Sequence, residues 1–444
     1  MVNLMPHQEQ AVSWLLKNRR GLLAHEPGCG KTLTALETIN REGAKRVLVV
    51  APAPLLSVWR DEAEKWYGRK VIELRGTPAV REKIFDDLNR LERQESVILV
   101  CGYETLRIEF AKLKGFSWDA LIYDETLKIQ NHAAKVTKCA MQLKAPLKIA
   151  LNGTPISNSW ADLWPVMTWL EPLSLYGNFY KFRGIHAIMN PYFPAITGWR
   201  DTETIKLRTA PLMHVRRKRD VLDDLPDMTE QTVEFELSAA EKVIYRTIKD
   251  ELRIELAGED VPIGNALVKL LRLRQAANGL FAFGDDETSS KLDTLEELLE
   301  KIPSDAKVLV FTSFKDTANE IKRRLGDKTE IITGDSSYAE REESIARFRS
   351  VSRVLVGTDA IAYGITLTEA SYVIMVDLPF SYAKYEQRIG RAWRKGQKNA
   401  VTVYNLEASG TVDAHVSRIL QRKLKTADEV TSVTRDDLRS ILDA

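Results

Sequence analysis

The sequence has too few cysteines to be held together by disulfide bonds. It contains three in 444 residues, namely Cys29, Cys101 and Cys139. Small secreted domains that depend on a disulfide framework carry many more, so this class of protein is excluded. The low cysteine content instead indicates a reducing, intracellular compartment, and we expect the protein in the cytoplasm.

The sequence also lacks long apolar runs and a leader. No apolar run approaches the roughly 18–20 residues that a membrane-spanning helix requires. The first residues, MVNLMPHQEQ, contain no basic segment followed by an apolar core, which is the pattern of a signal peptide. We therefore expect no membrane association.

An excess of charge of either sign is missing as well. Lys and Arg number 64, and Asp and Glu number 62, which gives a net charge of +2. A surface that binds nucleic acid would then have to be a local basic patch, offset by acidic surface elsewhere. With 44% apolar and 28% charged residues, the composition is that of a folded chain, and 444 residues indicate two or three domains.

Short apolar runs of strand length are what the sequence does contain, and they form two series with helix-length spacers. The first series comprises 46–51, 97–101, 120–123 and 148–151, and the second comprises 308–312, 330–333, 354–356, 372–376 and 401–404. Strands that are apolar throughout are typical of parallel sheets with both faces covered. We therefore predict an α/β fold with two tandem parallel-sheet domains.

The region between the two series has a different character. It is rich in Trp, Tyr, Phe and Pro at its start, and it ends in an amphipathic helix opened by a capping box of Ser238 and Glu241. Its basic run HVRRKR at 214–219 fits either a solvated face or contact with phosphate groups. The predicted organisation is a first domain at 1–156, mostly helical insertions and a linker shared by both lobes at 157–290, a second domain at 291–408, and a brace helix with a tail at 409–444.

The strongest local pattern is a glycine-rich loop before a predicted helix. Backbone N–H groups of such a loop converge on phosphate oxygens, and the helix adds the positive end of its dipole. Lys31 would reach the β- and γ-phosphates of a nucleotide, and the hydroxyl of Thr32 would bind Mg²⁺. The residues assigned to nucleotide binding are His25, Glu26, Pro27, Gly28, Cys29, Gly30, Lys31 and Thr32. The strict pattern has a small residue where His25 stands, so the match is imperfect.

Two adjacent carboxylates, Asp124 and Glu125, directly follow the apolar run at 120–123. They would lie at the carboxyl end of a strand, where α/β proteins bind ligands. Transfer of a phosphoryl group to water needs one carboxylate to hold the Mg²⁺ shell and another to orient the water. Asp124 fits the first role and Glu125 the second, so the two patterns together predict hydrolysis of a nucleoside triphosphate.

A third pattern is the basic segment QRIGRAWRKGQ at 387–397, near the end of the second series. By itself it would be a solvated face or a nucleic-acid contact. Its arginines could also stabilise charge on a γ-phosphate, because a guanidinium group offers bidentate hydrogen bonds. No Cys or His set has the spacing of a zinc site, so we expect His7 and His25 to make packing or polar contacts.

Together these segments resemble the motifs of superfamily-two helicases, and most closely those of the Swi/Snf-like DNA translocases. The loop LAHEPGCGKT is similar to the family's LADEMGLGKT, with His25 in place of Asp. DETLKIQN at 124–131 is similar to DEAHKIKN, with Leu127 in place of His. QRIGRAWRKGQ is similar to QAMDRAHRIGQ, with Trp393 in place of His.

Five further segments extend the resemblance over nearly the whole chain. They are LMPHQ at 4–8, LNGTP at 151–155, RRK at 216–218, VLVFTSF at 308–314 and GTDAIAYGITL at 357–367. The resemblance implies two RecA-like domains with helical insertions between them. Since the chain has room for little beyond such a motor, it is similar to minimal members of the phage or bacterial type.

The resemblance also implies roles for individual residues. Gln8 would contact the adenine base, and Arg391 and Arg394 would be the arginine fingers, whereas Arg388 would not. The implied coupling or nucleic-acid residues are Thr154, Arg216, Arg217, Thr312, Thr358 and Gly364.

The implied function is a DNA-dependent ATP hydrolase that uses ATP and Mg²⁺ and translocates on DNA with little sequence preference. As a monomer in a bacterial or infected-host cytoplasm, it would remodel or unwind duplex or branched DNA, such as a fork or four-way junction, in replication, recombination or repair. Three alternatives stay open. They are an RNA-remodelling helicase, a motor subunit of a restriction or defence assembly, and a nucleotide-gated DNA clamp with little turnover.

Overall fold

The computed structural model describes most of the chain. The described residues are 2–91, 95–153, 156, 159–190, 196–221, 225–257, 263–284, 288–361 and 365–425. The chain divides into two compact units, 1–223 and 224–444, and each contains one parallel sheet. Within the described residues, no helix is both long enough and apolar enough to cross a membrane.

The sheet of the first unit has seven strands in the order β3-β4-β2-β5-β6-β1-β9, and every pair is parallel. Four strands match the predicted apolar runs: β2 (Arg46–Val50), β4 (Val97–Cys101), β5 (Ala120–Asp124) and β6 (Leu147–Asn152). Three were not predicted: β1 (Arg20–His25), β3 (Lys70–Leu74) and β9 (Met213–Arg216). All residues of β4 and β5 are buried, as expected for strands covered on both faces.

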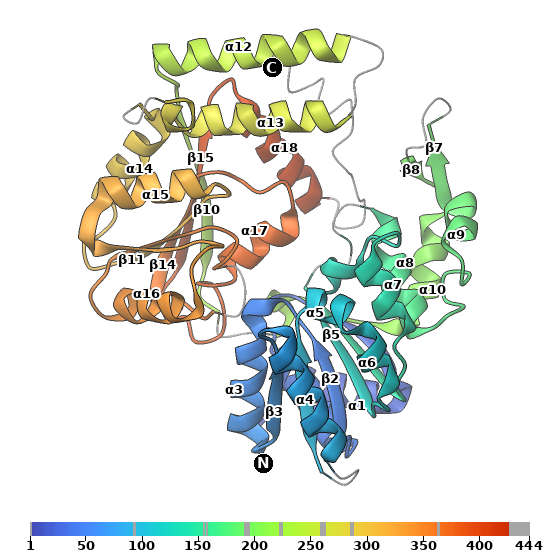
Figure 1. The fold of residues 1–444 in the computed structure, drawn as a ribbon. Helices are drawn as coiled ribbons and strands as arrows, with labels where there is room; N and C mark the ends of the chain where they lie inside the picture. Colours follow the sequence, from blue (N-terminus) through green and yellow to red (C-terminus); the bar gives the residue numbers. More distant parts are fainter. Residues whose placement is uncertain are drawn as a thin grey trace. The chain divides into compact units, whose positions relative to one another are not determined.

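Helices connect these parallel strands, and Figure 1 shows α3, α4 and α6 beside β2, β3 and β5. The helices are α1 (Pro6–Asn18), α2 (Lys31–Arg41), α3 (Leu56–Tyr67), α4 (Pro78–Arg90), α5 (Tyr103–Ile108), α6 (Phe110–Gly115), α7 (Lys135–Gln142), α8 (Leu163–Leu170), α9 (Phe179–His186), α10 (Thr202–Thr209) and α11 (Lys218–Val221). A small antiparallel hairpin, β7 (Ala187–Met189) with β8 (Ile196–Trp199), follows α9.

The second unit has a six-stranded parallel sheet in the order β10-β15-β14-β11-β13-β12. Its strands are β10 (Met228–Phe235), β11 (Lys307–Phe311), β12 (Thr329–Ile332), β13 (Val354–Gly357), β14 (Ala370–Met375) and β15 (Val401–Ala408). Its helices are α12 (Ala239–Ala257), α13 (Ile263–Asn278), α14 (Ser290–Lys301), α15 (Lys315–Leu325), α16 (Tyr338–Ser350), α17 (Tyr382–Ile389) and α18 (Val412–Lys425). α18 lies within 409–444, the region expected to contain a brace helix and a tail.

Both faces of the second sheet are covered, because alternate residues of β11 enter two different cores. Leu309 and Phe311 belong to a core that includes residues of α13, α16 and α18. Val308 and Val310 belong to another core with α14 and α15. The two predicted α/β units with parallel sheets are therefore confirmed.

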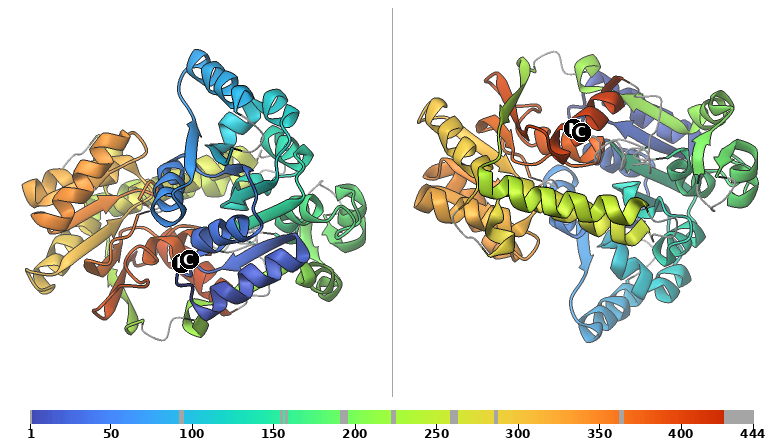
Figure 2. Two further views of the ribbon diagram at one scale, coloured as in Figure 1. Left: turned by 90° about the horizontal axis from the view of Figure 1, so that it is seen from below. Right: turned by 90° about the horizontal axis from the view of Figure 1, so that it is seen from above.

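The predicted capping box at the start of α12 is confirmed. Ser238 N donates to Glu241 Oε2 over 2.8 Å, and Glu241 N donates to Ser238 Oγ over 3.3 Å. Glu241 Oε1 also accepts from Ser290 N over 3.0 Å, so it joins the starts of α12 and α14. Figures 1 and 2 show α12 lying along α13.

The region 157–290, expected to be mostly helical, is divided between the two units and supplies an edge strand to each sheet. β9 pairs with β1, and β10 pairs with β15. Of these strands, β9 carries polar and basic residues, which mask the apolar pattern that reveals central strands.

Candidate functional site

The sheet order brings the glycine-rich loop and the acidic pair to one edge of the first unit. β6 lies between β1 and β5. Leu151 of β6 is in register with Leu23 of β1 on one side and with Asp124 of β5 on the other. Because the three strands are parallel, the residues after each emerge at the same carboxyl edge, where α/β folds bind ligands.

The loop turns sharply between β1 and α2. Gly28 and Gly30 have φ angles of 96° and 74°, which favour glycine, and α2 begins at the next residue, Lys31. Lys31 Nζ donates to the carbonyl oxygen of His25 over 2.7 Å and to that of Glu26 over 3.5 Å. The ammonium group thus lies over the loop, at the N-terminus of a helix whose dipole favours anions.

The start of α1 packs against this loop. Gln8 Nε2 donates to the carbonyl oxygen of Gly30 over 3.2 Å, and Gln8 Oε1 accepts from Met5 N over 2.9 Å. His7 Nε2 lies 3.0 Å from the carbonyl oxygen of Cys29. Gln8 and His7 are both buried, so these two side chains hold the loop, and the expected polar role of His7 is confirmed.

The carboxylate of Asp124 is buried and oriented by two donors. Trp59 Nε1 of α3 donates to Oδ2, and Glu125 N donates to Oδ1, each over 2.9 Å. Burial raises the pKa of Asp124 above its usual value, although the indole of Trp59 and the charge of Lys31 act against the increase. Glu125 is half-buried, and its φ of 52° lies in the left-handed region, which turns the chain directly after the strand.

Oxygen donors at this edge suit a small, hard cation. Thr32 occupies the second position of α2, and Asp124 supplies a carboxylate within the electrostatic reach of Lys31. Mg²⁺ is commonly held by one or two such protein oxygens together with substrate phosphates and water. Within the described residues, no group of three or more His, Cys, Asp or Glu side chains is arranged to hold a metal ion.

The basic run at 214–219 lies beside the glycine-rich loop. Its first residues form β9, and His214 Nδ1 lies 2.8 Å from Nε2 of His25. Burial lowers the pKa of His25 to about 2 and that of His214 to about 4, assisted by nearby positive charge, so both imidazoles are neutral at pH 7. This pairing could not be predicted from the sequence, where the only sign is a second histidine in the run. Arg216 is half-buried and donates to Gln10 Oε1 over 2.9 Å, whereas Arg217 is exposed.

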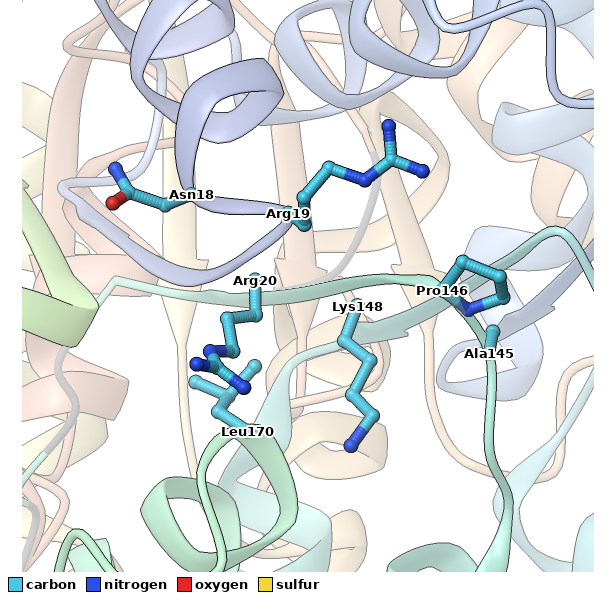
Figure 3. Close-up of a pocket in the computed structure, with 7 residues that line it drawn as sticks. All are labelled: Asn18, Arg19, Arg20, Ala145, Pro146, Lys148 and Leu170. Carbon is cyan, nitrogen blue, oxygen red and sulfur yellow. The ribbon is translucent and has the colours of Figure 1, made fainter.

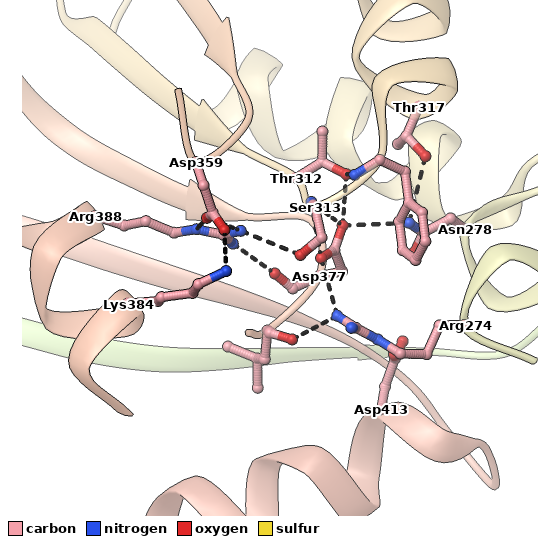
Figure 4. Close-up of polar contacts among 12 residues, drawn as sticks. Arg274, Asn278, Thr312, Ser313, Thr317, Asp359, Asp377, Lys384, Arg388 and Asp413 are labelled. Carbon is pink, nitrogen blue, oxygen red and sulfur yellow. Dashed lines mark hydrogen bonds and ion pairs between the residues drawn. The ribbon is translucent and has the colours of Figure 1, made fainter. Parts of the chain in front are cut away.

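In the second unit, Thr312 belongs to a buried polar network around Asp377 (Figure 4). The hydroxyl of Thr312 is fully buried and lies 2.5 Å from Asp377 Oδ2, while Arg274 Nη2 lies 3.1 Å from Asp377 Oδ1. Burial raises the pKa of Asp377, but the opposing charges of Arg274 and Arg388 outweigh it and lower the pKa overall. Thr312 therefore contacts groups within its own unit.

Arg388 lies in the same network and joins the ends of three strands. It is fully buried and donates to Asp359 Oδ1 over 2.8 Å, to Ser313 Oγ over 3.1 Å and to the carbonyl oxygen of Asp377 over 3.0 Å. Arg388 fixes the beginning of the segment that contains the two predicted fingers.

The predicted fingers follow α17. Arg391 is buried and donates to the carbonyl oxygens of Gln387 and Ile365, each over 3.1 Å, while Arg394 is half-buried. Trp393 between them donates to the carbonyl oxygen of Pro226 over 2.9 Å.

The other predicted residues are scattered. Thr358 is buried directly after β13, and Leu127 is half-buried in the helical turn Thr126–Ile129. Thr154 and Gly364 lie outside the described residues.

A basic pocket of about 360 Å³ lies at the opposite, amino-terminal edge of the first sheet (Figure 3). Its cations already have partners. Arg19 pairs with Glu42, Arg20 lies 2.7 Å from Glu171, and Lys148 Nζ donates to the carbonyl oxygen of Trp169 over 2.7 Å. Lys148 thereby binds a carbonyl in the last turn of α8, which accounts for its position without a ligand.

Comparison with known proteins identifies the family. The SNF2-related domain matches residues 7–281, and the helicase conserved C-terminal domain matches 290–396. An uncharacterized ATP-dependent helicase of Mycoplasma pneumoniae is 27% identical over 95% of this chain and 42% of its own length. The chromodomain-helicase-DNA-binding protein 3 homolog of Caenorhabditis elegans is 26% identical over 95% of this chain and 26% of its own.

A solved structure, the Sulfolobus solfataricus SWI2/SNF2 ATPase core in complex with dsDNA, is 26% identical and has a TM-score of 0.47, with 99% of this chain and 97% of that chain covered. The chain spans less than half the length of the two curated relatives above. Since the SNF2-related domain matches more than half of the sequence, the chain belongs to the SNF2-related family of Swi/Snf-like, superfamily-two ATP-dependent helicases.

Proposed function

We propose that the protein is a DNA-dependent ATPase motor that translocates on DNA. The observation that carries the proposal is the meeting of the phosphate loop and the Asp124–Glu125 pair at one edge of the first sheet. Hydrolysis of a triphosphate needs a cradle for phosphate, a carboxylate for a metal and a second carboxylate for water. All three lie at or directly after the carboxyl ends of β1 and β5, the two strands on either side of β6.

The proposed roles follow from these positions. Lys31 turns from the loop carbonyls to the β- and γ-phosphates, and Glu125 orients and deprotonates the attacking water. The segment from His25 to Thr32 is proposed to bind the nucleotide phosphates, and Gln8, which already contacts this loop, is proposed to contact the adenine base. Arg391 and Arg394 stabilise charge on the γ-phosphate.

Mg²⁺, when bound, would neutralise phosphate charge and polarise the γ-phosphate. Thr32 and Asp124 would hold it. Trp59 supports that role, because its N–H fixes one oxygen of Asp124 and thereby the direction of the carboxylate.

The DNA contacts are proposed to be mainly to phosphate groups, so we expect little sequence preference and a strong dependence on salt. Arg217, exposed beside the phosphate loop, is a first candidate. Arg216, Thr312 and Thr358, with Thr154 and Gly364, are proposed to couple hydrolysis to movement. Duplex or branched DNA is the proposed substrate, acted on by a monomer in the cytoplasm.

The test is ATP hydrolysis without nucleic acid and with single-stranded DNA, linear duplex, forked or four-way DNA, and RNA. Lys31→Ala and Glu125→Gln variants provide the blanks. We expect strong stimulation by duplex or branched DNA that both variants lose. Binding to DNA with no turnover on any of them would instead support a clamp, and stimulation by RNA alone would support an RNA helicase.

A further inference from the structure

Three contacts join the beginning of the phosphate loop to the end of the first unit. The imidazole nitrogens of His25 and His214 lie 2.8 Å apart. Glu26 N donates to the carbonyl oxygen of Arg216 over 3.0 Å, and Lys218 N donates to Glu26 Oε2 over 2.9 Å. We call these five residues the loop clasp.

The clasp continues the pairing of β1 with β9 beyond both strands. Leu23 is in register with His214, and His25 with Arg216. The two strands therefore run side by side, and β1 continues into the loop and β9 into α11. His25, His214 and Lys218 are buried. In this setting a hydrogen bond between neutral side chains excludes water and is costly to break.

The clasp holds the same two residues that the nucleotide must disturb. In this structure Lys31 Nζ donates to the carbonyl oxygens of His25 and Glu26. In the proposed function, this ammonium group leaves them to reach phosphate. Binding of a triphosphate therefore changes the surroundings of His25 and Glu26, and the further contacts of these two residues include those to His214, Arg216 and Lys218.

The other end of the clasp is the last described segment of the first unit. α11 ends at Val221, and the chain passes into the second unit between Asp223 and Asp224. Arg217 and Arg219 are exposed on either side of the buried Lys218. Movement of the clasp would therefore reach two exposed arginines and α11.

We propose that His214 is a positioning residue that transmits the occupancy of the phosphate loop to the segment 214–221. This inference rests on the proposed function for the binding of ATP, but it requires neither hydrolysis nor DNA. It assigns to the basic run a response to the occupancy of the nucleotide site, in place of the solvated face that its charge alone would indicate.

A pair of variants separates this role from simple packing. The side-chain amide of Asn places an oxygen or a nitrogen close to the position of the histidine Nδ1, so His214→Asn can keep the hydrogen bond to His25. His214→Leu fills similar space but leaves a buried imidazole nitrogen unsatisfied. Gln10→Ala, which removes only the contact of Gln10 with the Arg216 guanidinium, is the control beside the clasp.

The experiment is amide hydrogen exchange of the full chain with and without a non-hydrolysable ATP analogue and Mg²⁺, while analogue binding is measured separately by fluorescence. At about 100 times its Kd, the analogue should slow exchange of Lys218 N and its neighbours by about tenfold or more, because binding stabilises the closed loop. His214→Asn and Gln10→Ala should retain this effect. His214→Leu should bind the analogue but lose most of the slowing of exchange at Lys218 N and its neighbours.

The outcomes distinguish a failure of the clasp inference from a failure of the proposed function. If the unaltered protein binds the analogue and exchange at 214–221 does not change, the clasp does not transmit occupancy and the inference is overturned. It is also overturned if His214→Leu responds like the unaltered protein. If the unaltered protein does not bind the analogue, the proposed function itself fails. Should His214→Leu not fold, the response of the unaltered protein and of His214→Asn still decides.

Discussion

The indole N–H of Trp59 donates a hydrogen bond of 2.9 Å to Oδ2 of Asp124, across 65 positions of sequence. Trp59 is almost fully buried in α3, and Asp124 ends β5. The backbone of Asp124 is fixed as well, because Tyr103 Oη donates to its carbonyl oxygen over 2.7 Å. The carboxylate that we assign to Mg²⁺ is thus held in one direction before any ligand arrives, as preorganised sites require.

Replacing Trp59 with Phe should weaken the site through Asp124. The indole lowers the pKa of this carboxyl against the effect of burial, so its removal raises the pKa further. The acid side of the pH–activity curve should move to higher pH, since the carboxylate protonates earlier as the pH falls. We expect kcat to fall by about tenfold, in keeping with the loss of a hydrogen bond to a charged group, and the Mg²⁺ concentration at half-maximal activity to rise.

Trp118→Phe is the matched control for Trp59→Phe. Trp118 is also buried, and its indole N–H donates to the carbonyl oxygen of Leu113 over 2.9 Å, away from the acidic pair. It should lower stability without altering the Mg²⁺ requirement. An equal change in the Mg²⁺ titration of both variants would show that Trp59 acts only through packing.

Most of the strands and the chemical motifs could be predicted from the sequence, whereas β1, β3, β9 and the supporting contacts could not. β4 and β5 are apolar at nearly every position, and the loop and the acidic pair follow a fixed spacing. β9 is four residues long and only two of them, Met213 and Val215, are apolar, so its identity as a strand comes from pairing with β1, about 190 positions earlier. Leu55, Trp59, Ala63 and Trp66 recur at helical spacing, which indicates packing of one helix face but not a contact of Trp59 with Asp124.

Arg388→Met should strongly destabilise the second unit. The guanidinium is fully buried and lowers the pKa of Asp359 and of Asp377 against the effect of burial. Its removal takes one compensating charge from buried Asp377, which keeps Arg274, and from half-buried Asp359, which keeps Lys384. For the loss of a buried ion-pair partner we expect a decrease of up to about 3–5 kcal/mol in the free energy of unfolding. Asp359→Asn combined with Arg388→Met should recover part of it. Denaturant unfolding measures the stability of both variants. The control is Arg347→Met, which breaks the ion pair of half-exposed Arg347 with Glu330 and should change stability much less.

The neutral pair of His25 and His214 should make the first unit sensitive to acid. Both pKa values lie below the unfolded value near 6.5, at about 2 and about 4. The unfolded chain therefore binds more protons below pH 6.5, and stability is complete above that pH and falls as the pH drops toward 4. Each group contributes a slope of up to about 1.4 kcal/mol per pH unit. His214→Asn should show a shallower loss in unfolding between pH 6.5 and 4, and an unchanged slope would contradict a neutral His214.

Gly30→Ala should impair nucleotide binding for a reason that a matched glycine can isolate. Gly30 has a φ of 74°, and a Cβ there would lie 2.2 Å from Nε2 of Gln8. The left-handed conformation costs an alanine about 1–2 kcal/mol, and the clash displaces the side chain that holds the loop. We expect the KM for ATP to rise by about tenfold, with only partial recovery on adding Gln8→Ala, because the backbone strain remains.

Gly43 is the matched control. It has a similar φ of 70° just beyond the end of α2, but nothing lies within 4 Å of its Cβ position. Gly43→Ala should therefore lower stability and leave the KM unchanged, and a rise in KM there as well would trace the effect to strain in α2 rather than to the contact between Gln8 and the loop.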